Sequence, residues 1–342
     1  MSARVLVTGG AGYVGSAVVA ALLDAGHRVA VFDNLTTGHA DTLAGLDLEI
    51  VRGDLADRSA IENALRRFGA EAVVHVAGSI QAGESMADPG KYYRNNVVNS
   101  INLLDGMVAN GVQRFVFSSS AGVYGDPVRL PIEEADPLSP TNTYGETKLA
   151  IERAATWYGR AHGLRSVFLR YFNAAGATER LGESHDPETH IIPLALRVAL
   201  GQAVRFPIFG TDYATPDGTA IRDYVHVADL AHAHALALDA ADRAVSVAAS
   251  DSPPGQAFNL GSGSGFSNRQ VVETCRKVTG HPIPTIELPR RPGDPAVLVA
   301  NPRRAIDVLG WQPRFADLES IVASAWAWHQ QHPHGYAAAP QP

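Results

Sequence analysis

The stretch VLVTGGAGYVGS, residues 5–16, holds four glycines between a β-branched run and an apolar helical stretch. Glycine inside a helix or strand costs about 0.5–1 kcal/mol relative to alanine, so the repeated glycine needs a reason. Gly9, Gly12 and Gly15 follow one another at intervals of three residues. In a strand–turn–helix unit the first makes the tight turn, the second lets the backbone approach a pyrophosphate, and the third lets helix and strand pack closely. The stretch therefore predicts an α/β domain that binds a dinucleotide at a helix N-terminus.

The pattern of the chain changes near residue 175. Before it, short β-branched runs such as RVAVFD and AVVHVAG alternate with helical stretches such as RSAIENALRRFG. Apolar strands between amphipathic helices are typical of a parallel sheet covered on both faces. We predict a doubly wound Rossmann-type α/β domain over 1–175, a smaller α/β C-terminal substrate lobe over 176–335 with some chain crossing between the two, and a frayed tail over 336–342. Residues 240–255, rich in alanine, serine and proline, are expected to form an exposed, mobile connection.

The composition argues against several classes of protein. The chain has 342 residues, 46% of them hydrophobic and 18% charged, with a net charge of −7. This acidic balance disfavours a nucleic-acid or membrane-surface partner, both of which select a basic face. No apolar run approaches the ~18 residues of a membrane span. The single cysteine, Cys275, excludes an internal disulfide and fits a reducing cytosol, so we expect a cytoplasmic protein with a buried bystander thiol.

Acidic residues after the next two predicted strands indicate which dinucleotide binds. Asp33 ends the second strand, about 20 residues after the glycines, where an acid binds the adenosine 2′-hydroxyl and disfavours a 2′-phosphate. We therefore predict NAD rather than NADP. Asp54 follows the third strand, where it either contacts the adenine or caps the following turn.

A second group of residues suits proton transfer. Tyr144 and Lys148 lie four apart in a helical stretch, so both side chains fall on one face, one turn apart. We expect the ammonium and a positive nicotinamide ring to lower the tyrosine pKa from about 10 to about 7, which needs about 4 kcal/mol. Ser120 ends the run FVFSSS at the carboxyl edge of the predicted sheet, where open α/β folds bind ligands. There it is expected to hydrogen-bond the substrate oxygen that Tyr144 deprotonates.

Longer motifs carry a family resemblance over nearly the whole chain. The motifs TGGAGYVGS, SSSAGVYG, TYGETK, RYFNAAGA, DYATPDGTAIRDYVHV and FNLGSG together resemble the extended short-chain dehydrogenase/reductase superfamily. Within it the chain is most similar to the UDP-glucose (UDP-galactose) 4-epimerases, for which DYATPDGTAIRDYVHV is the most specific motif. The resemblance implies a UDP-hexose substrate and a homodimer formed through a helical bundle.

The resemblance also implies a reaction with no net redox partner. Tyr144 would take the proton of the sugar 4-hydroxyl while C4 gives a hydride to tightly held NAD⁺. The 4-keto sugar would then turn over in the pocket and receive the hydride on its opposite face. Lys148 would hold the nicotinamide ribose, and Ser120 would hydrogen-bond O4.

Further contacts are implied by the same resemblance. Asn173, Arg222, Arg291 and Asp294 would bind UDP, and arginine suits a diphosphate because its planar fork donates two hydrogen bonds at once. Alternatively, Arg222 forms an ordinary ion pair with Asp223, and Arg291 is loop charge. The remaining substrate contacts are Ser120, Tyr144, His190, Ile191, Ile208 and Phe209. The cofactor contacts are Gly9, Gly12, Tyr13, Val14, Gly15, Asp33, Asn34, Asp54, Leu55, Val76, Ala77, Gly78, Asn95, Ser118, Tyr144, Lys148 and Tyr171.

Four positions depart from the family pattern. Ile80 stands where a lysine is common beside the cofactor, and His190 where some members carry an asparagine near the sugar nucleotide. Thr143 precedes the tyrosine where proline is frequent, which is a mild change. Leu298 has an intermediate size at the position thought to decide whether N-acetylated sugars fit. The preferred sugar therefore stays open, and UDP-GlcNAc, UDP-glucuronate and UDP-xylose are alternatives.

Two other functions are less well supported, and no metal site is predicted. A 4,6-dehydratase needs an extra acid/base pair, but Ala121 and Gly122 follow Ser120. A non-catalytic NAD-binding regulator has no need of the serine, tyrosine and lysine that this chain retains. His232 and His234 lie two apart on a helical stretch and so on different faces, and the sequence shows no carboxylate or histidine at ligand spacing for His190 and His226.

Overall fold

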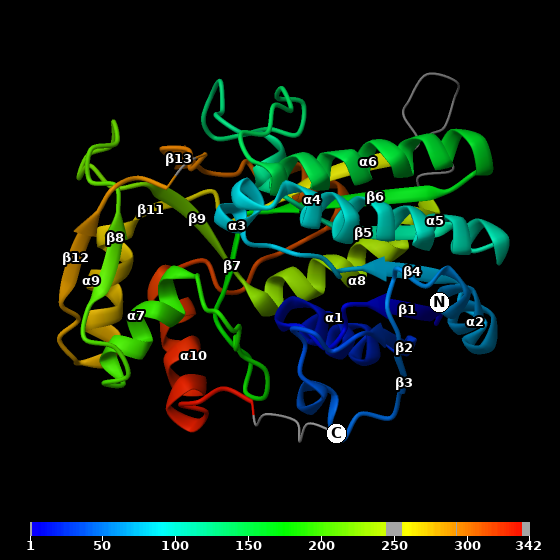
Figure 1. Ribbon diagram of the computed structural model, residues 1–342, viewed down its shortest axis with the longest axis horizontal. Helices are drawn as coiled ribbons and strands as arrows, with labels where there is room; N and C mark the ends of the chain where they lie inside the picture. Colours follow the sequence, from blue (N-terminus) through cyan, green and yellow to red (C-terminus); the bar gives the residue numbers. More distant parts are fainter. Residues whose placement is uncertain (1, 244–254, 292, 337–342) are drawn as a thin grey trace.

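The computed structural model describes residues 2–243, 255–291 and 293–336, and its centre is a seven-stranded sheet (Figure 1). The strands run in the order β10-β6-β5-β4-β1-β2-β3, and every pairing is parallel. Their bounds are β1 (Arg4–Thr8), β2 (Arg28–Asp33), β3 (Glu49–Arg52), β4 (Ala72–His75), β5 (Arg114–Ser120), β6 (Arg165–Tyr171) and β10 (Gly255–Leu260). This is the strand order of a dinucleotide-binding sheet extended by β10, so the predicted fold class is confirmed.

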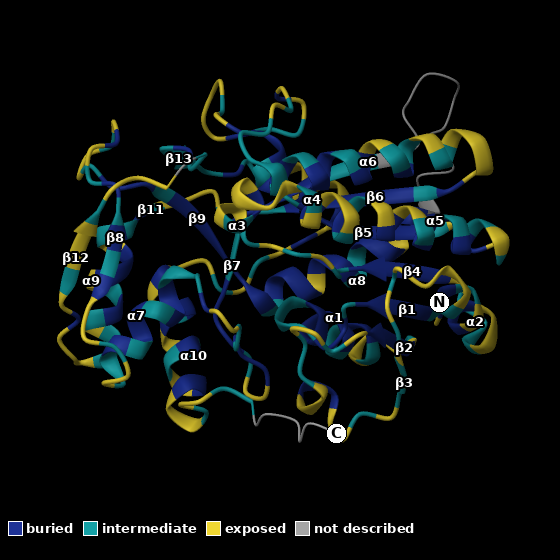
Figure 2. Cartoon of the chain, in the orientation of Figure 1, coloured by how far each residue is buried: buried dark blue, intermediate teal, exposed yellow. Residues whose placement is uncertain are grey.

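Helices cover both faces of this sheet. Helices α1 (Tyr13–Asp24) and α8 (Val227–Arg243) pack on one face, against strand side chains such as Val5 and Val7. Helices α2 (Arg58–Phe68), α5 (Asn99–Ala109) and α6 (Thr143–His162) pack on the other face, against side chains such as Leu6. Because side chains along a strand alternate between the two faces, both sets are buried. Figure 2 accordingly shows β1, β4 and β6 mostly in the dark blue of buried residues.

A smaller lobe lies beside the carboxyl ends of these strands, to the left in Figure 1. Its four-stranded sheet has the order β11-β9-β13, with β7 paired to β9, and a second sheet pairs β8 with β12. The apolar side chains of its three helices meet in one core. The bounds of the lobe's elements are β7 (Asn173–Ala175), α7 (Ile191–Ala199), β8 (Phe206–Phe209), β9 (Ile221–His226), β11 (Gly265–Ser267), α9 (Asn268–Thr279), β12 (Thr285–Leu288), β13 (Val297–Leu298) and α10 (Leu318–Gln331).

The chain crosses between the two lobes after residue 175, so a single boundary there does not divide them. Helix α8 packs in the core that α1 shares, and β10 pairs with β6 in the large sheet. Residues 244–254, most of the expected mobile connection, lie outside the described residues. Tyr336, placed in the predicted frayed tail, is instead held, because its hydroxyl accepts a hydrogen bond from the Gly182 N–H at 3.0 Å. The rest of that tail, 337–342, also lies outside the description.

Short helical turns complete the described chain. They are η1 (Ala40–Leu43), α3 (Ala82–Ala87), α4 (Pro89–Tyr92), η2 (Tyr93–Val98), η3 (Ala121–Val123) and η5 (Ala305–Leu309). Cys275 is buried on α9, and burial raises the pKa of its thiol to about 12, so the expected unreactive thiol is confirmed. Within the described residues, no helix combines the length and the apolar character needed to cross a membrane.

Candidate active site

The glycine loop joins β1 to α1, and three of its four glycines are required by packing, among them Gly10, where a Cβ would lie 2.7 Å from the buried Val31 side chain. Gly9 has a φ of +74°, and a Cβ on it would lie 2.5 Å from the backbone nitrogen of Ala77. A Cβ on Gly15 would lie 1.9 Å from the Gly9 carbonyl oxygen, so only glycine lets α1 approach the loop this closely. At Gly12 the nearest atom to a Cβ is 3.4 Å away, which is ordinary contact. The protein's own packing therefore does not require glycine at position 12. The missing side chain leaves space for a ligand to contact the Gly12 backbone directly.

The start of α1 has the features of an anion site. Gly12 is its N-cap residue and offers no side-chain cap, and the first turn holds no acidic residue. The N–H groups of an uncapped first turn carry a partial positive charge and are free to bind phosphate. The hydroxyl of Tyr13 is not part of this site, because it donates to the Gly176 carbonyl at 2.6 Å and ties α1 to the smaller lobe. Val14 is half-buried against the core behind the loop.

Asp33 at the end of β2 holds the glycine loop in place, a role that its position in the sequence did not predict. Its Oδ2 accepts a hydrogen bond from the Ala11 N–H at 2.9 Å, and its Oδ1 accepts one from the Leu35 N–H at 2.8 Å. The carboxylate thus fixes the glycine loop against the turn after β2. Beside it, the Asn34 amide donates to Asp54 Oδ2 at 2.9 Å, while Asp54 Oδ1 accepts from the Ala56 N–H. The turn-capping alternative for Asp54 is therefore present in the structure.

The segment after β4 lies against the glycine loop. The N–H groups of Val76 and Ala77 both donate to the Thr8 carbonyl, at 3.0 and 3.1 Å. Gly78 follows with a φ of +154°, and a Cβ on it would lie 3.2 Å from the side-chain oxygen of Asn96. Leu55, from the turn after β3, is half-buried against the opposite core. These predicted cofactor residues therefore converge on one edge of the sheet.

Asn96 is a positioning residue that was not predicted from the sequence, although its neighbour Asn95 was predicted as a cofactor contact. Its Oδ1 accepts from the Ser79 N–H at 2.8 Å, and its Nδ2 donates to the Ser79 carbonyl and to the Thr147 hydroxyl. Asn95 makes a single contact to the same loop, donating to the Ser79 hydroxyl at 3.0 Å. The buried Asn96 thus joins the loop after β4 to α6, which carries Tyr144 and Lys148.

Helix α6 begins at Thr143, so Tyr144 lies in its first turn. Asn142 caps the helix by accepting from the Gly145 N–H at 2.9 Å, which makes Thr143 its first residue. Proline is favoured at that first position, but a capped threonine serves equally to start the helix. A Cβ on Gly145 would lie 2.3 Å from the Gly122 carbonyl, so glycine is needed for α6 to approach the turn after β5. This approach brings Tyr144 to Ser120.

Lys148 lies one turn below Tyr144 and is buried. Its ammonium donates to the Ser118 carbonyl at 2.8 Å, and its nitrogen lies 4.9 Å from the Phe117 ring centre and 5.8 Å from that of Tyr144. Burial lowers the pKa of Lys148 to about 8. The lysine therefore remains mostly charged at pH 7 although the protein removes it from water.

The predicted lowering of the Tyr144 pKa relies on a bound nicotinamide ring as well as Lys148, and the chain without cofactor shifts this pKa the other way. Burial raises the pKa of the phenol above its usual 10, and hydrogen bonding by Ser120 lowers it only in part. The Lys148 ammonium lies by the face of the ring and is held by the Ser118 carbonyl, so it does not outweigh burial. Side chains of this protein by themselves therefore do not make a phenolate at neutral pH, and a further positive charge beside Tyr144 is needed.

Ser118 lies beneath the site, whereas Tyr171 is half-buried, as Tyr144 is. Ser118 is fully buried, and its hydroxyl lies 2.8 Å from His234 Nε2. Burial lowers the pKa of His234 to about 4, so this imidazole is neutral. Burial raises the pKa of the Tyr171 phenol, and hydrogen bonding by Ser118 opposes it. Ser118 therefore contributes to the site through its backbone carbonyl, which accepts a hydrogen bond from Lys148.

One cavity of about 270 Å³ opens in the smaller lobe and reaches Ile80 in the loop after β4. Ser120 and Tyr144 are not among its lining residues. Seven of the residues predicted to bind substrate line it, namely Asn173, His190, Ile191, Phe209, Arg222, Arg291 and Asp294. Ile208 does not line it, since its side chain is buried in the core of the smaller lobe, and its substrate contact stays a prediction.

The two arginines of the cavity differ in their partners. Arg222 is buried, pairs with Asp294, and donates to the carbonyls of Ile221 and Pro295 at 2.7 and 2.6 Å. The alternative pairing with Asp223 is wrong, since that carboxylate instead accepts from Ser262, Gly263 and Ala300. Arg291 stacks over Phe209, with 4.0 Å from its guanidinium carbon to the ring centre. Among the described residues no hydrogen bond or ion pair is recorded for Arg291, so its donors are available to an anion.

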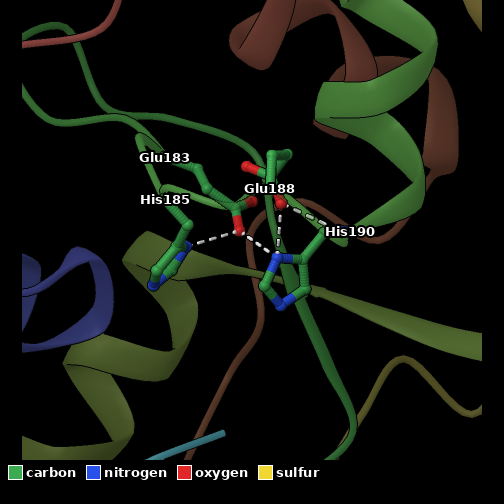
Figure 3. Close-up of side chains that lie close together, drawn as sticks. All are labelled: Glu183, His185, Glu188 and His190. Atoms are coloured by element: carbon green, nitrogen blue, oxygen red, sulfur yellow. Dashed lines mark hydrogen bonds and ion pairs between the residues drawn. The ribbon is translucent and has the colours of Figure 1, made fainter. Parts of the chain in front are cut away.

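Four side chains at one end of the cavity form an acid–histidine cluster, namely Glu183, His185, Glu188 and His190 (Figure 3). The reason given for excluding a metal, that His190 lacks partners at ligand spacing, is therefore wrong. Burial by itself lowers the pKa of His190, but Glu183 and Glu188 outweigh it and hold that pKa well above its usual range. Burial raises the pKa of Glu183, and the two imidazoles more than reverse this, to about 2.

Comparisons with known proteins show what this arrangement is similar to. The model of the NAD dependent epimerase/dehydratase family matches residues 5–261. The chain is 50% identical over 335 residues to a UDP-glucose 4-epimerase of Halalkalibacterium halodurans, covering 97% of each chain. A crystal structure of UDP-glucose 4-epimerase matches with a TM-score of 0.91 at 46% identity, covering 98% of this chain and 100% of the other. Another, from Bifidobacterium longum in complex with NAD⁺ and UDP, matches with a TM-score of 0.90 at 36% identity, covering 97% and 100%.

Proposed function

Because the chain belongs to the NAD dependent epimerase/dehydratase family, we propose that it interconverts UDP-glucose and UDP-galactose. One observation carries the proposal. Tyr144, in the first turn of α6, lies beside Ser120 at the carboxyl edge of the sheet, with Lys148 buried one turn below. The glycine loop lies at that same edge, and the cavity with Arg222 and Arg291 lies in the adjoining lobe. The residues for proton transfer, for dinucleotide binding and for diphosphate binding are therefore close enough to act on one bound sugar nucleotide.

The cofactor is NAD, and the residues present fit it. The bare Gly12 and the uncapped start of α1 suit a pyrophosphate. Asp33, held at the end of β2, presents the negative charge that suits a ribose 2′-hydroxyl and repels a 2′-phosphate. Lys148 holds the nicotinamide ribose. Bound NAD⁺ supplies the acceptor for the electron pair of C4 and a positive charge beside Tyr144.

Tyr144 and Ser120 carry the proton chemistry. Tyr144 takes the proton of the sugar 4-hydroxyl while C4 is oxidised to the ketone, and it returns that proton when C4 is reduced from the opposite face. The Ser120 hydroxyl accepts from the Gly122 N–H at 3.1 Å, so its own hydrogen remains available for O4. Without substrate the Ser120 hydroxyl hydrogen-bonds Tyr144 and lowers its pKa, and with the sugar bound it turns to O4 and stabilises the charge that develops there. Reduction from the opposite face requires the 4-keto sugar to turn over in the site while the rest of the substrate stays bound.

The UDP group is held in the cavity of the smaller lobe. Arg291 offers a guanidinium with free donors, which suits a bidentate contact to a phosphate. Arg222 is already paired with Asp294, so it shapes the wall and offers positive charge rather than a free fork. Asn173 starts β7 on the cavity wall. Tight binding of UDP lets the 4-keto sugar rotate without leaving.

The direct test incubates the protein with UDP-galactose and no added NAD, and follows UDP-glucose by NMR. Conversion to the equilibrium mixture supports the proposal. Net NADH or a 4-keto-6-deoxy sugar would show a dehydrogenase or a dehydratase instead. A panel with UDP-GlcNAc, UDP-glucuronate and UDP-xylose then ranks the alternative sugars. Leu298 of β13, half-buried against a small core cluster, is the size-determining position that this panel tests.

Replacing Asp33 with alanine should weaken NAD binding about 10–100-fold, the loss expected for hydrogen bonds to a charged group. The carboxylate is proposed to contact the ribose, and it also fixes Ala11 and Leu35 beside the dinucleotide. Calorimetric titration of cofactor-free protein with NAD and with NADP measures both affinities. Asp57→Ala, which removes the exposed cap of α2, is the matched control and should leave them unchanged. Equal affinity of the parent for NAD and NADP would contradict the assigned role.

The homodimer implied by the family forms through α5 and α6, which pack side by side. Large apolar side chains are exposed there and on the preceding turn η2: Trp157 is 64% exposed, Val98 51% and Tyr93 43%. Trp157→Glu should convert the dimer to a monomer, because it places a charge where apolar surface is buried. Light scattering on a sizing column measures the mass. Val204→Glu, at a position 83% exposed in the smaller lobe, should leave the dimer intact, and a dimeric Trp157→Glu protein would contradict this interface.

The cytoplasm is the proposed location. The single thiol of the chain is buried and cannot form an internal disulfide, which is the usual condition of a protein in a reducing compartment.

A further inference from the structure

The acid–histidine cluster brings four potential metal ligands to one point. The donor atoms of Glu183, His185, Glu188 and His190 all lie within 4.8 Å of one another. His190 Nδ1 lies 2.5 Å from Glu183 Oε1 and 2.8 Å from Glu188 Oε1, and His185 Nδ1 lies 3.1 Å from the same Glu183 oxygen. Figure 3 shows both imidazoles turned toward the carboxylate of Glu183. The side chains come from one loop between β7 and α7, so no distant rearrangement is needed to bring them together.

The cluster buries two carboxylates against two imidazoles. The side chains of Glu183 and Glu188 are 5% and 1% exposed, and buried carboxylates need compensating positive charge. His190 Nδ1 carries at most one hydrogen, yet oxygens of both carboxylates lie within hydrogen-bond distance of it. Glu188 Oε1 also accepts from the Thr189 and His190 N–H groups at 2.7 and 2.8 Å, while Glu183 Oε1 faces both imidazoles. A cation between the four donors would bind both carboxylates and both ring nitrogens at once.

The cavity beside the cluster gives independent evidence of polar space. Glu183 and His190 line it, and so do Tyr224, Trp328 and His329. The last three are each more than nine-tenths buried, and their Oη, Nε1 and Nε2 atoms have no hydrogen-bond partner among the described residues. Buried polar atoms without a protein partner usually bind water or a ligand. The cavity wall thus has unused polar groups where water on a bound ion would need partners.

We propose that Glu183, His185, Glu188 and His190 bind one divalent first-row transition metal ion, of which Zn²⁺ fits best. Two imidazoles and two carboxylates suit Zn²⁺ and its neighbours, whereas Mg²⁺ and Ca²⁺ prefer oxygen ligands only. The proton that His190 shares with the carboxylates leaves to solvent, because a metal-bound ring nitrogen carries no hydrogen.

The ion would fasten the loop between β7 and α7 next to the glycine loop. The ring of His185 meets that of Tyr13 edge-on at 6.5 Å, and the Tyr13 hydroxyl donates to Gly176 at the start of the same loop. The Ser184 carbonyl lies 2.8 Å from His39 Nε2 in the segment after β2. The ligands thus sit between the cavity and the elements proposed to hold the dinucleotide. This site does not depend on the proposed epimerase reaction.

Titration of chelator-treated full-length protein with Co²⁺ and with Zn²⁺ tests the proposal. We expect one ion per chain, visible d–d absorption from coordinated Co²⁺, and its loss on addition of Zn²⁺. Mg²⁺ should not compete. His185→Ala should weaken Zn²⁺ binding about 100-fold or more, whereas His232→Ala, which removes an exposed histidine of α8, should have no effect.

A second variant separates loss of a ligand from loss of the fold. Glu183→Gln keeps the size of the side chain and should also weaken Zn²⁺ binding, with the far-UV circular dichroism of the parent retained. Stoichiometry near zero in the parent would overturn the proposal. Equal Zn²⁺ affinity in the parent and in a folded His185→Ala protein would overturn it too, because the ion would then be bound elsewhere.

Discussion

Tyr144→Phe should lower kcat by about 10²–10⁴-fold, the range that a positioned general acid–base supplies. The substitution removes only the hydroxyl that exchanges a proton with the sugar 4-hydroxyl. The backbone of Tyr144 keeps its hydrogen bond, in which its N–H donates to the Ser85 hydroxyl at 3.0 Å, so the start of α6 should be unchanged. UDP binds in the cavity of the smaller lobe, which Tyr144 does not line, so its Kd should stay within about twofold. Steady-state kinetics and calorimetry with UDP measure the two quantities.

Tyr158→Phe is the matched control for this loss. Tyr158 lies on the same helix and donates its hydroxyl to Asp105, away from the site. Its kcat should equal that of the parent. Unchanged turnover in Tyr144→Phe would remove the phenol from proton transfer, and loss of UDP binding together with turnover would indicate a structural effect instead.

Lys148→Met should abolish most turnover and at the same time stabilise the cofactor-free protein. Burial holds the Lys148 pKa near 8 rather than 10.5, which corresponds to about 3 kcal/mol of destabilisation of the folded state at pH 7. Methionine removes that cost but leaves the Ser118 carbonyl without its donor, a loss of about 1–2 kcal/mol. The free energy of unfolding in urea at pH 7 should therefore rise by about 1–2 kcal/mol. Turnover should fall about 100-fold or more.

The pH dependence of this gain has a definite sign. Between pH 8 and 10.5 the unfolded parent binds a proton at Lys148 that the folded parent has lost, so the parent gains stability as pH rises through that window. The advantage of Lys148→Met should therefore be greatest below pH 8, vanish between pH 8 and 10.5, and turn into a disadvantage near pH 10.5, where the variant still lacks the donor to the Ser118 carbonyl. Lys277→Met, at an exposed lysine that pairs with Glu319, should change stability by less than about 0.5 kcal/mol. A Lys148→Met protein less stable than the parent at pH 7 would contradict the assigned burial cost.

Features set by local spacing could be predicted from the sequence. The interval of three between Gly9, Gly12 and Gly15 predicts a loop with close backbone approaches. The structure has such an approach, because a Cβ on Gly15 would lie only 1.9 Å from the Gly9 carbonyl oxygen. The interval of four between Tyr144 and Lys148 predicts one helix face, and both lie on α6. The alternation of β-branched and helical stretches predicts the parallel sheet. In each case the decisive contacts lie within a few residues along the chain.

Features set by tertiary packing could not be predicted in the same way. Arg222 pairs with Asp294, 72 residues away, rather than with its neighbour Asp223, because β9 turns adjacent side chains to opposite faces. The acid–histidine cluster is local, spanning residues 183–190 with a repeated Glu-x-His, but it lies in an irregular loop, where spacing along the chain does not fix which side chains meet. The direction of the Tyr144 pKa depends on burial, which spacing does not report.

Transfer of a label at C4 tests the central claim most directly. The protein is incubated with UDP-galactose deuterated at C4, in ordinary water and without added NAD, and the UDP-glucose formed is examined by NMR and mass spectrometry. The account predicts that the product keeps its deuterium at C4, because the same electron pair and nucleus return to the carbon that lost them while Tyr144 exchanges only the hydroxyl proton. Product with hydrogen from water at C4, or no product at all, would contradict it.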